Sequence, residues 1–562
     1  MNFQILLKKR LIEILYDLIS KKKIKSFEPV ESHFNLEIQT NKKFGDVSSN
    51  IAMVYSKKCE ISASELGNLI VEELQKDFMI RNIKFVKPGF INIFLKNSFW
   101  HEQIINFLEK GFVNPYNVIS KKYCVEFVSA NPTGLMHIGH ARGAVLGDSI
   151  CSLLEEIGHN VTREFYINDA GEQISKLHKT IEFYLNEKQN NNLPDDLYPG
   201  EYLENLSKKL SSSKFLEKEK IVDIILNDIK KDLHFLKINH DNFISEKKNS
   251  TKSVIEDFID RLDKLKLIYH GFQDKPQSAD LSWKPEKQLL FKSKKFGDDA
   301  DRALIKPDGS PTYFLLDLIY HQTKINRDYE VLINVWGVDH SGYVLRLKNA
   351  LKSINLKKKY FLDIKLTALV NLLDGKKPVK MSKRSGNYVT LRQVLDKVGP
   401  DALRFMMISR SPDKKIDFDF QLVQEKSKDN PVFYIQYAHA RCCSLIRNSK
   451  KIIKKPTNFK NVNLDNLKLE EEISLIISVC NFYNVIYSAA TNLEPHKLIN
   501  YLLELSKNFH FYWGLGKLDE EKKIFNESKL DVSLSRLTLV YAVSFILKKG
   551  LKILKINCPE SM

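Results

Sequence analysis

Two histidines, His137 and His140, lie three residues apart, and Gly139 stands between them. At this spacing both imidazoles share one face of a helix. The first turn of a helix presents unpaired backbone N–H groups and the positive end of the helix dipole, which attract phosphate. Because Gly139 has no Cβ, a flat base or a ribose can lie against the backbone. The pattern indicates a nucleotide site, and the alternative is a helix start with two surface histidines.

A second group of chemistry-bearing residues is the basic stretch Asp374–Leu391. Its cations stand on a loop rich in glycine and serine that follows a buried strand, which suits a phosphate clamp. Lysine ammonium groups stabilise the charge that develops on a transferring phosphoryl group. The alternative is an ordinary solvated run of charge. The cations are Lys376, Lys377, Lys380, Lys383 and Arg384.

A parallel sheet would bring these two groups together. Residues 123–128 have a strand pattern, Asn131–Gly134 has turn chemistry, and a helix then runs to about Gly158. A second strand at Asn160–Tyr166 completes a β-α-β unit, which implies a parallel sheet. The stretch Val331–Leu347 repeats the order of buried strand and helix. Nucleotides bind at the carboxyl ends of such strands, so we expect both groups at that edge.

The chain divides into three expected units. Residues 1–115 form a small α+β domain with a hairpin at Ile83–Lys96, which is either a scaffold or a nucleic-acid-binding appendage. Residues 116–395 form a Rossmann-type α/β core, interrupted by a largely helical, lysine-rich insertion at about 172–287. Residues 396–562 are expected to be all helical.

The composition narrows the function classes. The chain of 562 residues is 43% hydrophobic and 28% charged, as in a globular protein, and it is too long for one core. Its net charge of +18 favours a polyanionic partner such as nucleic acid, although a general enrichment in Lys, Ile and Asn would also produce it. There is no run of roughly 18 apolar residues and no signal peptide, so no membrane segment is expected.

Cysteine usage suggests a reducing compartment. The 7 cysteines form no C-x-x-C pair and no Cys/His spacing suited to zinc. Scattered free thiols are typical of the cytosol. We therefore expect a cytoplasmic protein without a structural metal.

The two signatures together resemble those of the class I aminoacyl-tRNA synthetases. His-Ile-Gly-His at 137–140 is similar to the HIGH motif, and Lys-Met-Ser-Lys at 380–383 is similar to the KMSKS motif, in the same order and with an insertion between them. The match is closer to the arginyl-tRNA synthetase family and covers nearly the whole chain. Five stretches carry it: Phe44–Asn50, Val125–His140, Gly399–Phe405, Asn430–Arg441 and Asn557–Met562.

The resemblance implies an arginine–tRNA ligase that works in two steps. ATP and L-arginine give arginyl-adenylate and diphosphate, and the arginyl group then moves to the 2′-hydroxyl of the terminal adenosine of tRNA(Arg). The family works with Mg²⁺–ATP, generally needs tRNA for amino-acid activation, and is monomeric. The implied fold is a Rossmann-type core, an N-terminal domain that contacts the tRNA elbow, and an all-α anticodon-binding domain.

The resemblance also implies roles for single residues. Arg384 stands where the class signature has serine, so its role stays open. His137, His140, Lys380 and Lys383 are the expected catalytic residues. The other expected contacts are Gly139, Gly337, Asp339, Met381 and Ser382 with ATP, Glu126, Asn131, Tyr313, Asp317 and Glu246 with arginine, and Tyr437 and Met562 with tRNA.

The chemistry of the expected arginine contacts agrees with this assignment. A guanidinium presents five donors in a planar fork, which a buried carboxylate meets best. Asp317 and Tyr313 are four residues apart on one helix and provide an acceptor and an aromatic hydroxyl together. Outside this context the pair would be a solvated helix face. The carboxylate of arginine attacks phosphorus itself, so catalysis rests on positioning and electrostatics.

Three alternatives were weighed against this interpretation. Another class I synthetase, such as the cysteinyl enzyme, conflicts with the lack of a Cys/His zinc cluster. A non-catalytic RNA-binding relative conflicts with the intact histidines and lysines. A nucleotidyltransferase with the same ATP-binding fold would not need the basic N-terminal unit or the helical last third.

Overall fold

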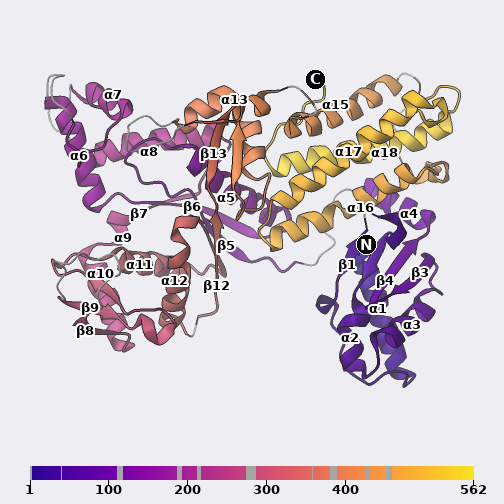
Figure 1. Cartoon of the computed structure of the whole chain (residues 1–562), viewed down its shortest axis with the longest axis horizontal. Coiled ribbons are helices and arrows are strands. Elements are labelled where there is room, and N and C mark those ends of the chain that lie inside the picture. Colours follow the sequence, from indigo (N-terminus) through magenta and orange to yellow (C-terminus); the bar gives the residue numbers. More distant parts are fainter. Residues whose placement is uncertain are drawn as a thin grey trace.

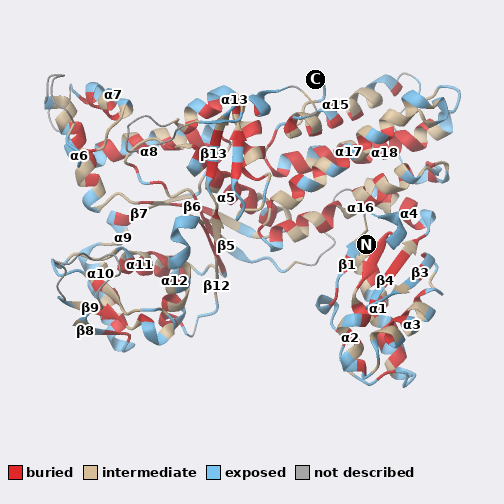
Figure 2. Cartoon of the chain, viewed as in Figure 1, coloured by how far each residue is buried: buried red, intermediate tan, exposed pale blue. Residues whose placement is uncertain are grey.

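The computed structural model describes most of the chain, in three units that lie side by side (Figure 1). The N-terminal unit lies at the lower right of the view, the helical C-terminal unit at the upper right, and the α/β core at the centre and left. Buried residues concentrate along the central strands and on the inward faces of the C-terminal helices (Figure 2). The described residues are 3–39, 41–110, 118–186, 193–211, 217–273, 286–356, 358–379, 389–425, 427, 429–450, 452 and 458–562.

The N-terminal unit is a four-stranded antiparallel sheet packed against helices. Its elements are α1 (Phe3–Ser20), β1 (Leu36–Ile38), β2 (Val47–Ser49), α2 (Ile51–Cys59), α3 (Ala63–Leu74), β3 (Ile80–Val86), β4 (Phe90–Leu95) and α4 (Asn97–Lys110). The strands are ordered β1-β2-β4-β3. The predicted hairpin is confirmed, with Ile83 opposite Ile93. Ile91 and Ile93 are fully buried, because alternate residues of a strand face the same side.

The α/β core is built on a five-stranded parallel sheet, as the β-α-β pattern predicted. Its elements are β5 (Lys122–Glu126), α5 (Ile138–Glu156), β6 (Asn160–Ile167), β7 (Asn242–Ser245), α11 (Tyr313–Asn326), β11 (Val331–Gly337), α12 (Ser341–Ile354) and β12 (Phe361–Thr367). The order is β12-β11-β5-β6-β7. Leu332 packs in the apolar cluster of α11 and α12, and Ile333 packs in that of α5. Helices therefore cover both faces, which is why the central strand β11 is almost wholly apolar.

The expected insertion at 172–287 is not wholly separate from the core. Its short strand β7 pairs in parallel with β6 at the edge of the main sheet. All four residues of β7 are half-buried, so the sequence carries no alternating pattern there. The other elements of this region are α6 (Gly171–Asn186), α7 (Glu201–Leu210), α8 (Lys218–Phe235), α9 (Glu246–Asn249), α10 (Lys252–Lys264), β8 (Ile268–Phe272), β9 (Lys287–Phe291) and β10 (Arg302–Ile305), and β8 to β10 form a sheet of their own.

A third small sheet leads from the core to the helical unit. Its strands are β13 (Val370–Asp374), β14 (Lys377–Pro378) and β15 (Ile416–Asp419), and the helices that follow are α13 (Leu391–Met407), α14 (Phe420–Gln424), α15 (Pro431–Ser449), α16 (Glu470–Thr491), α17 (His496–Leu518) and α18 (Leu530–Ile553). Gly399 has φ +77° and bends α13, and a new helical run begins at Pro400, as predicted.

Two of these helices, α16 and α18, are long and apolar enough to cross a membrane by length and composition. Both pack within the helical unit, where 56% and 67% of their most apolar windows are buried. Their apolar surface is therefore used as core.

One fully buried carboxylate, Asp148 of α5, joins the core to the C-terminal helical unit. It accepts hydrogen bonds from Arg404 of α13 at 2.8 Å, from Lys555, which follows α18, at 2.7 Å, and from Arg163 of β6 at 3.3 Å. Arg404 also donates to the carbonyl of Leu554 at 2.8 Å. Burial opposes ionisation of Asp148, but the three cations hold its pKa below the ordinary value.

Candidate functional site

A cavity of ≈ 720 Å³ opens at the carboxyl ends of the parallel strands. Strands β5 and β11 are neighbours, and the helices that follow them cover opposite faces of the sheet. A crevice at such a switch point is the usual ligand site of an α/β sheet. The cavity brings together these residues assigned from the sequence: Glu126, Asn131, His137, Gly139, His140, Tyr313, Asp317, Gly337 and Asp339.

The two histidines cap the start of α5. His137 Nδ1 accepts from the backbone N–H of Gly139 at 3.1 Å, and His140 Nδ1 accepts from the backbone N–H of His137 at 3.2 Å. The rings are stacked, with centroids 4.0 Å apart. Because each Nδ1 is an acceptor, the proton of the neutral ring is on Nε2, which can donate to an anion. A Cβ on Gly139 would lie 2.8 Å from the His137 ring, so a side chain there would displace that ring.

The backbone is strained where it leaves β5 and enters the cavity. Val128 has φ +72° and Ser129 has φ +40°, and a β-branched residue rarely adopts such a value. The turn lets Ser129 Oγ donate to Glu126 Oε1 at 3.0 Å and accept from the backbone N–H of Tyr166 at 3.1 Å. Further along, Asn131 Nδ2 donates to Gln173 Oε1 at 2.9 Å. The turn therefore fixes the Glu126 carboxylate at the cavity wall.

Three carboxylates make the opposite part of the site acidic. Burial, with added repulsion from Glu126 and Glu246, raises the pKa of Asp317 to about 7. Glu246 is buried, which raises its pKa too, and it accepts from the Tyr166 hydroxyl at 2.8 Å. Among the described residues, Glu246 does not line the cavity and reaches it through Tyr166, which does. A cation relieves this repulsion, so the pocket favours a cationic ligand.

The affinity for a guanidinium ligand should therefore rise with pH. Below its pKa of about 7, Asp317 must lose a proton before it can pair with the ligand. Arginine affinity is expected to fall about tenfold per pH unit below that value and to level off above it. Arginine KM measured from pH 6 to 8.5 checks this. The dependence should vanish in the Asp317→Asn variant, and a flat profile in the unaltered protein would contradict the assignment.

Several residues of the site escaped the sequence analysis. Lys324 and Asn334 are fully buried, and His321 is 1% exposed. Lys324 and His321 lie on the same helix as Asp317, where a lysine and a histidine would ordinarily be solvated. Asn334 gave a weak signal, as one amide in an apolar strand. Lys324 and Asn334 lie behind the cavity lining, whereas His321 is part of it. The lining residues without an earlier assignment also include Tyr166, Gln173, Tyr320, Trp336, His340 and Tyr343.

The basic loop approaches the histidines at its far end. The backbones of Thr390 and His137 pair in an isolated antiparallel β-bridge. The backbone N–H of Leu391 donates to the carbonyl of Met136 at 2.7 Å. The chain that leaves the loop is thus attached directly before α5. The expected contacts Lys380, Met381, Ser382 and Lys383, together with Arg384, lie outside the described residues.

The predicted tRNA contacts belong to the helical unit. Tyr437 is 37% exposed and Met562 is 54% exposed. Next to Tyr437, the Arg441 guanidinium lies 4.5 Å from that ring and 3.7 Å from the ring of Trp513, and it contacts His510 Nδ1 at 2.7 Å. Aromatic faces beside a cation can stack on unpaired bases. The sequence did not pair Arg441 with Trp513 because the two stand on different helices.

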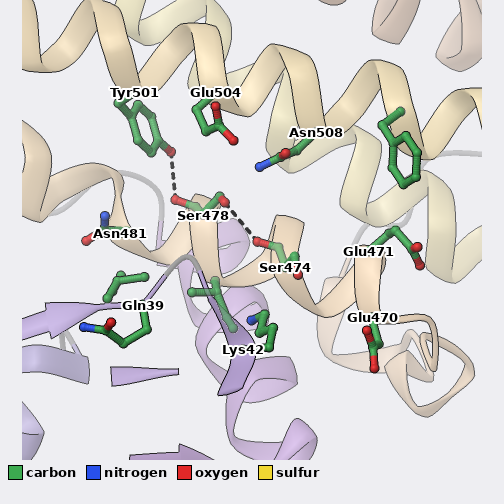
Figure 3. A pocket seen from close by; sticks show the side chains of 13 residues that line it. Gln39, Lys42, Glu470, Glu471, Ser474, Ser478, Asn481, Tyr501, Glu504 and Asn508 are labelled. Atoms are coloured by element: carbon green, nitrogen blue, oxygen red, sulfur yellow. Dashed lines mark hydrogen bonds between the residues drawn. The ribbon is translucent and has the colours of Figure 1, made fainter. Parts of the chain in front are cut away.

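A second cavity, of ≈ 490 Å³, lies where the N-terminal unit meets α16 and α17 (Figure 3). Its charged lining residues are Lys42, Glu470, Glu471 and Glu504. Tyr501 donates to the carbonyl of Ser478 at 2.8 Å. No histidine is among the described residues that line it, so we place the chemistry in the first cavity.

The metal-binding potential of the described part of the chain is low. No group of three or more His, Cys, Asp or Glu residues there could hold a metal ion. All cysteines are free thiols.

Three domain families match the chain in succession. They are an arginyl-tRNA synthetase N-terminal domain at residues 6–95, a catalytic domain of the class I (R) tRNA synthetases at 103–426, and a DALR anticodon-binding domain at 435–562. With its parallel sheet and the cavity at the strand ends, the chain is a class I aminoacyl-tRNA synthetase.

Relatives narrow the class further. An arginine–tRNA ligase from Ehrlichia chaffeensis is 40% identical over 100% of both chains, and one from Wolbachia pipientis subsp. Culex pipiens is 41% identical over 94% of this chain and 95% of its own. The arginyl-tRNA synthetase structure from Thermus thermophilus shares the fold, with a TM-score of 0.73 and 19% identity over 99% of this chain and 100% of that one. The chain belongs to the arginyl-tRNA synthetase family.

Proposed function

We propose that the first cavity holds ATP and L-arginine together and that the chain is the arginine–tRNA ligase its relatives are. One observation carries the proposal: the capped start of α5 and the Asp317 carboxylate line the same cavity. The helix start attracts phosphate, and the carboxylate attracts a guanidinium. No single substrate of another kind explains both ends.

The proposed first step is attack of the arginine carboxylate on the α-phosphorus of ATP. A bond forms between a carboxylate oxygen and phosphorus, the bond from phosphorus to the diphosphate oxygen breaks, and arginyl-adenylate remains. Asp317 and Tyr313 bind the guanidinium, with Glu246 adding negative charge behind them. Glu126 and Asn131 bind the α-ammonium group and so set where the carboxylate meets phosphorus.

The phosphates lie toward α5 in this proposal. His137 and His140 donate from Nε2 to phosphate oxygens, and Gly139 lets the nucleotide approach the backbone. Lys380 and Lys383 supply charge from the basic loop, where Met381 and Ser382 complete the ATP contacts. Gly337 and Asp339, at the end of β11, contact the adenosine part.

Mg²⁺ is proposed to enter with ATP. Mg²⁺ commonly keeps several waters and binds through substrate phosphates rather than in an all-protein cage. Bound there, the ion would offset negative charge on the departing diphosphate.

The second step gives the flanking units their roles. The 2′-hydroxyl of the terminal adenosine of tRNA(Arg) attacks the arginyl carbonyl, and AMP leaves. We assign residues 1–115 to the tRNA elbow, 116–395 to catalysis and 396–562 to the anticodon, where Tyr437 and Met562 contact tRNA. The net charge of +18 and the exposed aromatic residues beside Arg441 support these contacts. We further propose a cytoplasmic monomer.

An ATP–diphosphate exchange assay with each amino acid, with and without total tRNA, tests the function. Among the amino acids, we expect L-arginine to be the one that supports exchange, and we expect exchange to require tRNA. Exchange with another amino acid would assign the chain to another synthetase. Absence of exchange under every condition would favour a non-catalytic relative.

A further inference from the structure

A buried lysine on α11, Lys324, stands directly behind the cavity. Its ammonium group donates to Glu126 Oε2 at 2.5 Å and to Asn334 Oδ1 at 3.1 Å, and it lies 4.2 Å from the centre of the Tyr320 ring. The side chain is fully buried. Lysine is almost never fully buried unless its charge is paired, so this position requires a reason.

Lys324 is tied to both ends of the proposed arginine site. Asn334 Nδ2 donates to His321 Nε2 at 2.7 Å, and His321 Nδ1 donates to the backbone carbonyl of Asp317 at 2.8 Å. Burial and the nearby Lys324 charge lower the pKa of His321 well below its ordinary value, so the ring is neutral and fits this pattern. A continuous set of hydrogen bonds therefore connects Glu126, at the α-ammonium end, with the Asp317 backbone.

The charges around the cavity are balanced by the same lysine. Glu126, Asp317 and Glu246 together carry three negative charges when ionised, and Lys324 offsets one of them. Two remain. L-arginine carries two cationic groups besides its reacting carboxylate, so the substrate neutralises what is left. Buried charge is tolerated only when it is paired, which makes this match a binding requirement.

We propose that Lys324 is a positioning residue of the arginine site, which holds Glu126 toward the α-ammonium group and sets the pocket charge to that of L-arginine. The inference rests on the proposed function and deepens it. Without the positive charge of Lys324, the three carboxylates repel one another more strongly, and together they take up a proton at neutral pH. Arginine must then displace that proton before it binds.

The titratable and charged groups that face Lys324 come from β5, β6 and α11. Cys124 and Glu126 face Lys324 from β5, Glu164 faces it from β6, and Tyr320 and His321 face it from its own helix. Asp317 is faced by Tyr343, Glu126, Glu246 and Lys324. Lys324 donates to both Glu126 and Asn334.

The cation directly after α11, Arg327, provides a matched control. Arg327 forms a two-pronged pair with Glu164, at 2.6 Å and 2.9 Å, and Glu164 is fully buried. Glu164 is not among the described residues that line the cavity. Removal of Arg327 therefore breaks the pair of a buried carboxylate three residues from Lys324, without changing a residue that lines the cavity.

The test measures arginine KM by ATP–diphosphate exchange on the full chain with tRNA(Arg), from pH 6 to 9. Lys324→Met should move the inflection of the plot of arginine KM against pH up by about one pH unit. It should therefore raise arginine KM about tenfold at pH 6, about fivefold at pH 7 and hardly at all at pH 9. ATP KM should stay unchanged. Lys324→Gln, which keeps a donor but loses the charge, should move the inflection equally and decides the matter if Lys324→Met does not fold.

Arg327→Met should lower the melting temperature and leave the inflection of the plot of arginine KM against pH in place. The inference is overturned if both Lys324 variants keep the inflection of the unaltered protein, or if Arg327→Met moves it as far. Absence of arginine-dependent exchange in the unaltered protein is a different result, because it refutes the proposed function itself.

Discussion

Replacement of Asp317 by asparagine should raise the arginine KM about a hundredfold or more, while the ATP KM stays within about twofold. Loss of one partner of a buried, hydrogen-bonded charge pair costs roughly 2–5 kcal/mol. Asparagine has nearly the same size as aspartate, so the cavity keeps its shape. It loses the charge, and its amide N–H₂ group turns a donor toward the donors of the guanidinium.

The control for Asp317 is a carboxylate of the parallel sheet that does not line the cavity. Asp363 of β12 accepts from Lys348 at 3.3 Å and pairs with Lys365 at 3.5 Å. Asp363→Asn should leave the arginine KM unchanged. An arginine KM that is unaltered in Asp317→Asn would remove Asp317 from the pocket, and a parallel rise in the ATP KM would indicate a general disturbance of the site.

Replacement of Lys383 by alanine should slow adenylate formation by about 10²–10³-fold. Removal of one donor that stabilises transition-state charge has costs of this size. Because the lysine is assigned to the reacting phosphates, tRNA affinity should stay within about twofold. Single-turnover formation of arginyl-adenylate and equilibrium tRNA binding measure the two quantities separately.

A neighbouring cation controls for the general loss of positive charge. Lys377, exposed on β14, precedes the Lys-Met-Ser-Lys stretch. Lys377→Ala should change adenylate formation by less than about threefold, since exposed charges interact weakly in water. If Lys383→Ala weakened tRNA binding as much as adenylate formation, the lysine would be a tRNA contact rather than a phosphate contact.

The sequence predicted the elements whose pattern is local. Apolar runs such as Val331–Gly337 and the turn at Asn131–Gly134 identify strands and their ends, and the ends of parallel strands define the cavity edge. The four-residue strand β7 was missed, because it is too short and too evenly half-buried to show a period. The hairpin at Ile83–Lys96 was found because its alternation extends over two strands.

The part of the site that depends on tertiary contacts could not be predicted. Lys324 has the sequence context of a solvated helix lysine, and only the packing of α11 on β5 shows that it is buried beside Glu126. Arg441 ends one of the stretches that carry the family resemblance, yet its stacking on Trp513 depends on how two helices cross. Each residue type was visible in the sequence, but its partner was not.

The contacts of Asp148 bear on whether the catalytic unit is stable as a separate fragment. A fragment that ends after the catalytic domain match, at residue 426, would keep Asp148 and Arg404. It would lose Lys555 and the Leu554 carbonyl, which pair with them in the intact chain. Asp148 and Arg404 would still pair with each other, but loss of some partners of a buried ion cluster destabilises a fold. The catalytic unit is therefore not a minimal synthetase, and the core and the anticodon-binding helices should unfold as one cooperative block.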